Sequence, residues 1–428
     1  MQLPNTTAAR LPFRDALRVW ARIGCLSFGG PAGQIALMHR EIVDERQWLS
    51  EKDYLAALNF CMLLPGPEAM QLATYAGWKL HGIRGGLAAG LLFVLPGALV
   101  VLLFTMIYAA FGNVPWIAAL FYGVKAAVLA IVIEALLRVA RRALKTNADW
   151  IIAGLAFLAL YCFGLPFPLI ILAAAIYGFI RGSGIREEHK GTLPTLSALS
   201  GTIATWGAIW LLPLAALALI LGPDHVLTEI GVYFSKLAIV TFGGAYAVLA
   251  YMAQAAVEKE AWLTAPEMID GLALAETTPG PLILVTQFVG YFAALREMGS
   301  VWGGIAGALV TLWMTFAPCF LWIFAGAPYI EAIGKRPRLA GALAAITAAV
   351  VGVILNLSVW FGLHVLFGKV ERIDAGWFRP WIPDWAHLDW FALALSLVAA
   401  LALLRFHLGI VRTLALCAVL GLAWKTLL

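Results

Sequence analysis

The chain has 428 residues, of which 62% are hydrophobic and 12% are charged, whereas soluble domains average about 45–50% and about 25%. This composition excludes a soluble globular protein, and apolar runs of about 20 residues recur from end to end, which predicts helices that span a bilayer. The formal charge of +5 suits loops that face anionic lipid, so we expect the lipid bilayer, and no nucleic acid, as a partner.

The predicted fold class is an all-α polytopic membrane protein of about 13 transmembrane helices. Their ranges are 16–38, 54–78, 86–111, 115–137, 149–163, 166–180, 196–221, 230–256, 267–294, 302–325, 339–361, 389–404 and 411–427. The N-terminal segment carries Arg10, Arg14 and Arg18 and leads into an amphipathic segment without a small-residue cleavage site. We therefore expect no cleaved signal peptide.

The first span is interrupted at Ser27-Phe28-Gly29-Gly30. A glycine pair beside a hydroxyl group can expose several N–H groups at the start of a half-helix, which attracts anions. Close helix packing through small residues is the alternative explanation. Arg22 lies five residues before the break, and a cation within a membrane is by default functional. The alternative is that its side chain extends to the inner interface.

The second span is interrupted at Pro65-Gly66-Pro67, where two backbone donors are missing and the glycine lets the chain unwind. We expect two half-helices with an unwound segment that lines a wet cavity, and a simple proline kink is the alternative. Glu68 follows directly. This carboxylate either carries a coupling proton or pairs with a cation, and the sequence leaves both open.

Lysine and arginine residues gather in three short connections, which predicts that these connections are cytoplasmic. They are Arg138, Arg141, Arg142 and Lys145, then Arg181, Arg186 and Lys190, then Lys335, Arg336 and Arg338. With the N-terminus in the cytoplasm, the acidic loop of residues 41–53 falls outside, its counterpart at 258–270 falls inside, and the C-terminus is external. Glu134 is expected to pair with Arg138 one turn away, on the opposite face of its helix from Lys125.

The second half of the chain repeats the first at a separation of 214 residues. Ser27-Phe28-Gly29-Gly30 recurs as Thr241-Phe242-Gly243-Gly244, Pro65-Gly66-Pro67 as Pro279-Gly280-Pro281, and Arg22 as Lys236. We predict a first repeat at 1–190, a linking helix within 191–226 and a second, inverted repeat at 227–428. A duplicated apolar chain with broken segments is typical of secondary transporters.

The predicted substrate site gathers the residues at and beside the four breaks. They are Arg22, Ser27, Phe28, Gly29, Gly30, Pro65, Gly66, Pro67, Gln71, Lys236, Thr241, Phe242, Gly243, Gly244, Pro279, Gly280, Pro281 and Gln287, with Glu68 and Glu276 as coupling candidates. Asn59, Thr277, Thr278 and Asn356 are further cavity donors. The five cysteines occur singly and the seven histidines lack metal or haem spacing, so we expect no cofactor, no metal and no enzyme. A transporter of sulfate or another oxyanion is the alternative within the same class, and a membrane-embedded reductase and a passive channel are the alternatives from other classes.

The repeated Ser/Thr-Phe-Gly-Gly, the Trp-Leu at Trp48 and Trp262, and Leu64-Pro65-Gly66-Pro67 followed by Gln71 and Gly77 resemble the chromate transporter family, in its long-chain, two-repeat branch. The resemblance implies export of chromate through the bacterial inner membrane, with sulfate as a competing oxyanion and the proton or another ion as coupling partner. It leaves a homodimer open. The second half departs from the pattern, with Ala245 in place of Pro31 and Leu282 in place of Glu68.

Overall fold

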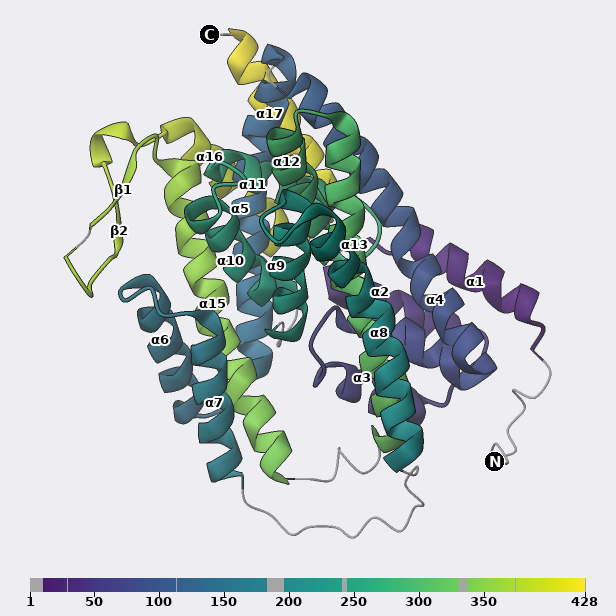
Figure 1. Ribbon diagram of the computed structural model, residues 1–428. Coiled ribbons are helices and arrows are strands. Elements are labelled where there is room, and N and C mark those ends of the chain that lie inside the picture. Colours follow the sequence, from purple (N-terminus) through teal and green to yellow (C-terminus); the bar gives the residue numbers. More distant parts are fainter. Residues whose placement is uncertain are drawn as a thin grey trace.

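We describe a computed structural model of the chain (Figure 1), which places residues 11–28, 30–112, 114–182, 196–240, 245–330, 337–373 and 375–427. The first half contains α1 (Phe13–Leu26), α2 (Gly30–His39), α3 (Glu51–Cys61), α4 (Glu68–Phe111), α5 (Pro115–Ala143), α6 (Asn147–Tyr161) and α7 (Phe167–Arg181). The second contains α8 (Leu196–Leu221), α9 (Val226–Val240), α10 (Ala245–Gln254), α11 (Ala265–Thr277), α12 (Val285–Met298), α13 (Val301–Gly326), α15 (Pro337–Leu366), α16 (Trp390–Ala400) and α17 (Ile410–Leu427). An antiparallel ribbon, β1 (Val370–Arg372) with β2 (Trp381–Pro383), lies between α15 and α16.

Within these described residues, six helices are long and apolar enough to cross a membrane. They are Glu68–Phe111, Pro115–Ala143, Leu199–Leu221, Val301–Tyr329, Arg338–Leu366 and Ile410–Leu427. Three shorter apolar helices accompany them, at Asn147–Tyr161, Phe167–Arg181 and Trp390–Arg405. The protein is therefore a multi-pass, all-α membrane protein, as predicted, with one short ribbon added.

The first predicted span does not run straight through. The Nε atom of Arg22 in α1 lies 3.5 Å from Oε1 of Glu41, just beyond α2. In one continuous helix these residues would be about 28 Å apart, because each residue adds about 1.5 Å. α1 and α2 therefore form a hairpin whose tip is the Ser27–Gly30 break, and the prediction of a full span over 16–38 is wrong.

The other three interrupted spans also double back. Lys79 lies 3.2 Å from Asp53, across α4 and α3. Arg296 lies 2.6 Å from Glu267, across α12 and α11. In the remaining hairpin, the rings of Tyr233 in α9 and Trp262, which follows α10, have centroids 5.2 Å apart. The spans predicted at 54–78, 230–256 and 267–294 are therefore hairpins too, because half-helices of 10 to 15 residues cannot cross about 30 Å of hydrocarbon.

Because the chain reverses at the first break, the acidic loop of residues 41–53 lies at a different place from the one predicted. α4 is kinked at His81 and Gly82, where the helical φ and ψ angles are lost. Nε2 of His81 lies 2.9 Å from the carbonyl oxygen of Leu11, at the start of α1. Since residues 41–53 contact the same hairpin ends, this loop lies at the same end of the protein as Leu11. The expectation that it lies on the opposite side from the N-terminus is wrong.

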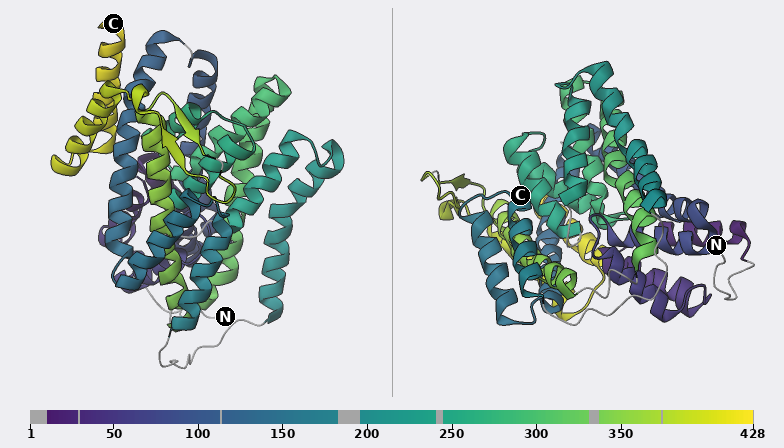
Figure 2. Two further views of the ribbon diagram at one scale, coloured as in Figure 1. Left: turned by 90° about the vertical axis from the view of Figure 1, so that its left-hand side faces the viewer. Right: turned by 60° about the horizontal axis from the view of Figure 1, so that its bottom comes forward.

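The two halves of the chain exchange packing partners around a shared centre. α5 packs against α16 and α17, whereas its counterpart α15 packs against α6 and α7. In Figure 1, α6 and α7 occupy the lower left of the bundle, whereas α16 and α17 lie at its upper end. α8 stands at the edge of the bundle (Figure 2), with only 6% of its most apolar window buried.

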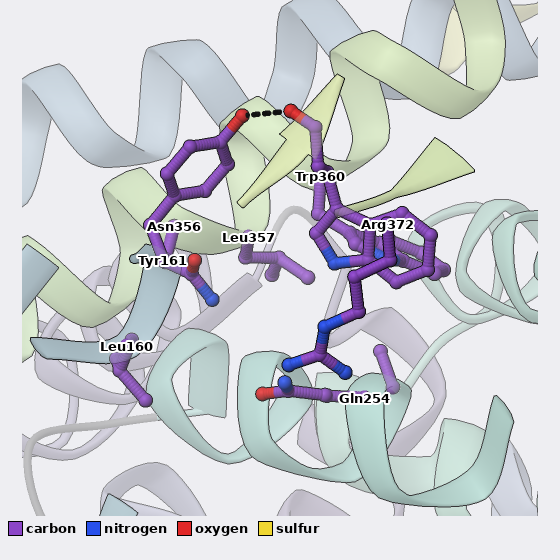
Figure 3. Close-up of a pocket in the computed structure, with 9 residues that line it drawn as sticks. Leu160, Tyr161, Gln254, Asn356, Leu357, Trp360 and Arg372 are labelled. Atoms are coloured by element: carbon purple, nitrogen blue, oxygen red, sulfur yellow. Dashed lines mark hydrogen bonds between the residues drawn. The ribbon is translucent and has the colours of Figure 1, made fainter. Parts of the chain in front are cut away.

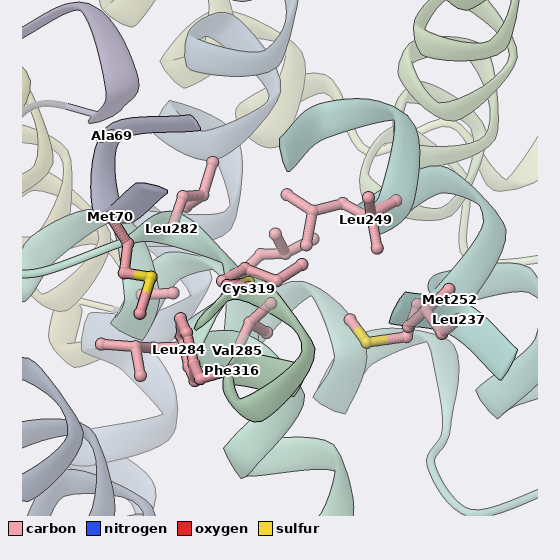
Figure 4. Packing of buried hydrophobic residues seen from close by; sticks show 14 of the residues in the cluster. Ala69, Met70, Leu237, Leu249, Met252, Leu282, Leu284, Val285, Phe316 and Cys319 are labelled. Atoms are coloured by element: carbon pink, nitrogen blue, oxygen red, sulfur yellow. The ribbon is translucent and has the colours of Figure 1, made fainter. Parts of the chain in front are cut away.

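The buried core lies where the hairpins of both halves meet α4 and α13. Figure 4 shows Met70 of α4 among Leu282, Leu284 and Val285 of the second half, with Cys319 of α13 beside them. These side chains are at most 2% exposed. Close packing at this point holds the hairpin tips in fixed positions relative to the long helices.

Candidate functional site

Hairpin tips from the two halves of the chain touch directly. The backbone N–H of Gly280 donates to the carbonyl oxygen of Ser27 over 2.8 Å. Nε2 of Gln34 in α2 donates to the carbonyl oxygen of Gly280 over 2.6 Å. Gly280 has φ +93°, a conformation that favours glycine. The Pro-Gly-Pro segment of the second half is therefore held against the first break of the first half.

Each Pro-Gly-Pro tip packs on the proline-containing long helix of the other half. In α4, Gly97 follows Pro96, and a Cβ atom at Gly97 would lie only 2.1 Å from the carbonyl oxygen of Pro279. In α13, Cys319 follows Pro318, and a Cβ atom at Gly66 would lie 3.0 Å from its Sγ atom. The two tips thus occupy equivalent places at the centre of the protein.

Some predicted donors at the tips are already used by the protein itself. The hydroxyl of Ser27 donates to the carbonyl oxygen of Ile23 over 2.6 Å, and Nε2 of Gln71 donates to that of Pro65 over 2.6 Å. The Oε1 atoms of Gln71 and Gln287 are buried without a hydrogen-bond partner among the placed residues. Phe28 is exposed, at 41%. Gly29, Thr241, Phe242, Gly243 and Gly244 lie outside the described residues.

A cavity of about 970 Å³ lies between the first-half hairpins and helices α5 and α15. Its polar lining consists of Asn59, Glu68, Arg138, Arg142, Lys145, Thr146, Asp149, Tyr246 and Thr347, and its apolar lining includes Pro31, Leu64 and Gly66. Lys145, Thr146 and Asp149 belong to the connection from α5 to α6. The cavity therefore runs from that connection to the Pro65-Gly66-Pro67 tip, and three cations line it.

A buried carboxylate lies behind the wall of this cavity. Glu276, at the end of α11, is 4% exposed, and the hydroxyl of Tyr246 donates to its Oε1 over 2.9 Å. Its Oε2 has no hydrogen-bond partner among the described residues. Arg138 is near enough to act on Glu276 electrostatically, as Arg142 is on Glu68. Both coupling candidates are thus close to the cations of the cavity.

The two intramembrane cations proposed from sequence do not line the cavity. The side chain of Arg22 is 56% exposed and contacts Glu41, which also pairs with Arg46 over 2.6 Å. Lys236 is exposed on α9.

A second buried charge pair joins α5 to a hairpin of the second half. Nζ of Lys125 lies 3.1 Å from Oδ2 of Asp270 in α11, and the hydroxyl of Tyr108 in α4 donates to the same oxygen over 2.6 Å. Asp270 is 3% exposed. The expected pair of Glu134 with Arg138 is confirmed. No local sequence pattern predicts the partner of Lys125, because Asp270 lies in the other half of the chain.

The β1–β2 ribbon closes a small pocket with room for about one water molecule, 10 Å³ (Figure 3). The hydroxyl of Tyr161 donates to the carbonyl oxygen of Trp381 over 2.6 Å. Arg372 reaches Glu258 over 2.7 Å, and Asn356 lines this pocket rather than the large cavity. The β1–β2 ribbon therefore covers the protein at this place.

Sequence reasoning missed four residues of the site. Gln34 joins two tips, Tyr246 binds Glu276, and Arg138 and Arg142 line the cavity. For Gln34 and Tyr246 a signal existed, since each is a polar group in an apolar helix directly after a break.

Comparison with known proteins decides the family. The family model described as "Chromate transporter" matches residues 14–179 and 228–422, two blocks with α8 between them. The chain belongs to the chromate transporter family. The chromate transport protein of Cupriavidus metallidurans is 30% identical over 87% of this chain and 88% of its own length. The chromate transport protein of Pseudomonas aeruginosa is 33% identical over 82% of each chain.

A third relative in the family, a probable chromate transport protein of Synechococcus elongatus, is 30% identical over 82% of this chain and 85% of its own length. Because coverage is high on both sides, these likenesses extend through both halves of the chromate transporter fold. No solved structure matches the chain.

Proposed function

We propose that this protein exports chromate from the bacterial cytoplasm through the inner membrane. One observation carries the proposal: a cavity of about 970 Å³, lined by Arg138, Arg142 and Lys145, leads to the Pro65-Gly66-Pro67 tip of the first half. Cations beside an unwound, buried backbone suit a doubly charged anion. The relatives that are named chromate transport proteins support the substrate, and sulfate, also a tetrahedral dianion, is the expected competitor.

The direction follows from charge and orientation. The cavity reaches the α5–α6 connection, whose basic residues place it in the cytoplasm under the positive-inside rule. This orientation puts the N-terminus inside and the C-terminus outside. When a dianion leaves a cell with a negative interior, its electrical free energy falls by about 4.6 kcal/mol per 100 mV of membrane potential. This is twice the value for a single charge. Export is therefore the favourable direction from this cavity.

The mechanism proposed is alternating access between inverted repeats, at 1–190 and 227–428, joined by a linking helix within 191–226. The exchange of α6 and α7 for α16 and α17 at opposite ends of the bundle supports the inversion (Figure 1). Ala56 lines the cavity, whereas its counterpart Asp270 is packed against α5 by Lys125. In this proposal the first-half hairpin is the open one and the second-half hairpin the closed one, so that exchanging the two arrangements would open the opposite side.

For coupling, we propose that Glu276 carries the proton, with Glu68 as the second candidate. Glu276 is the more buried of the two, and one of its oxygens has no hydrogen-bond partner among the described residues. Such a carboxylate within a membrane is a candidate proton carrier. A neutral glutamine at this position would keep the hydrogen bond from Tyr246 and remove the proton.

Flux of chromate into inside-out vesicles tests the proposal. We expect uptake that depends on the protein, is inhibited by sulfate, and rises when a proton gradient or membrane potential is imposed. Uphill accumulation separates a carrier from a channel, which only follows the electrochemical gradient of the anion. Vesicles that take up no chromate above the level of empty controls would refute the proposed function.

A further inference from the structure

The basic face of α5 turns two arginines into the cavity. Arg138 and Arg142 are four residues apart, hence one above the other on the same face of the helix, and both line the cavity. Arg141 lies in the same turn but does not line it. Arg138 and Arg142, but not Arg141, therefore line the cavity.

The two arginines differ in how they are paired. Arg138 is held by Glu134, which leaves part of its donor fork unused. Nη2 of Arg142 lies 3.3 Å from Sδ of Met62, which is a weak acceptor, and Arg142 forms no ion pair with any residue that the structure places. Arg142 therefore has N–H donors available for an anion.

Arg142 also contacts the segment that leads to a tip. Met62 follows α3 directly and precedes Pro65-Gly66-Pro67 by three residues. Gly66 and Glu68 line the same cavity. An anion bound at Arg142 would therefore touch both the long helix α5 and the first-half hairpin.

We propose that Arg138 and Arg142 form the oxyanion-binding pair of the cytoplasm-facing state, with Arg142 as the principal ligand. The inference rests on the proposed function and names the residues that recognise its substrate. The planar guanidinium fork matches two oxygens of a tetrahedral dianion, and Asn59 of α3 supplies a neutral donor from the facing wall. An anion bound between Arg138 and Arg142 would hold the first-half hairpin against α5 until the anion dissociates.

Two measurements on purified full-length protein test the pair. The first is thermal stabilisation by molybdate and by sulfate, which reports anion binding without transport. The second is the half-saturation concentration for chromate in inside-out proteoliposomes. For Arg142→Gln we expect loss of the stabilisation and at least a tenfold rise in half-saturation, whereas Arg142→Lys should recover part of both. Arg141→Gln, the matched control, should equal the wild type.

The outcomes separate this inference from the proposed function. If the wild type transports chromate and Arg142→Gln retains wild-type stabilisation and half-saturation, the binding pair is refuted and the function stands. If the wild type binds oxyanions through Arg142 but moves no chromate, the pair stands and the function is refuted. Size-exclusion profiles of the variants confirm that each is folded. Equal losses in Arg141→Gln and Arg142→Gln would also overturn the inference, since they would report general surface charge.

Discussion

A methyl group added at Gly97 would push α4 away from the Pro279-Gly280-Pro281 tip. A Cβ atom at residue 97 would lie 2.1 Å from the carbonyl oxygen of Pro279 and 2.7 Å from Cδ1 of Leu284. Non-bonded heavy atoms settle at about 3.5 Å, so α4 and the tip would have to move apart by more than about 1 Å. The displacement would also strain the hydrogen bond from Gly280 to Ser27.

For Gly97→Ala we expect chromate flux to fall by about 5-fold to about 150-fold, because overpacking costs about 1–3 kcal/mol and each factor of ten corresponds to about 1.4 kcal/mol. The assay is initial chromate uptake into inside-out vesicles, normalised to the amount of protein in the membrane. Gly154→Ala in α6 is the control, since a Cβ atom there meets nothing within 4 Å. Wild-type flux in Gly97→Ala would refute the reasoning that this close contact belongs to the transport cycle.

Three further predictions concern charged residues. Asp270→Asn leaves Lys125 without its carboxylate, so we expect a loss of about 3–5 kcal/mol of stability, measured by thermal unfolding; a variant as stable as the wild type would show that the pair does not hold α11 to α5. Glu276→Gln should keep chromate exchange but lose the dependence of flux on an imposed proton gradient, and an unchanged dependence would remove Glu276 as the proton carrier. Arg22→Gln should keep near wild-type flux, because Arg22 is exposed and Arg46 still pairs with Glu41; abolished flux with normal expression would contradict this placement.

The positions of the breaks could be predicted from sequence, but the reversal of the chain at each break could not. Pro65-Gly66-Pro67 separates α3 from α4 as the missing donors require. An apolar run of about 24 residues looks the same whether it crosses the bilayer or folds into two half-helices, because hydropathy carries no direction. The contact of Arg22 with Glu41 distinguishes a hairpin of two half-helices from a continuous span. Equivalent contacts do the same in the other hairpins.

The cations of the cavity are visible in the sequence, where they predict the orientation of the protein and not a binding site. Arg138, Arg142 and Lys145 satisfy the positive-inside rule, and a cytoplasm-facing cavity for an anion requires residues of the same kind at the same end. No local pattern separates an orienting arginine from a binding arginine. Tertiary packing alone shows that Arg142 faces the cavity and Arg141 does not.

The most direct test is an experimental structure of the protein with chromate bound. We predict density for the tetrahedral anion inside the cavity, within hydrogen-bonding distance of the guanidinium groups of Arg138 and Arg142, and beside the Pro65-Gly66-Pro67 tip. Density at Arg22 or Lys236 instead, with the cavity unchanged, would contradict the site described for this protein.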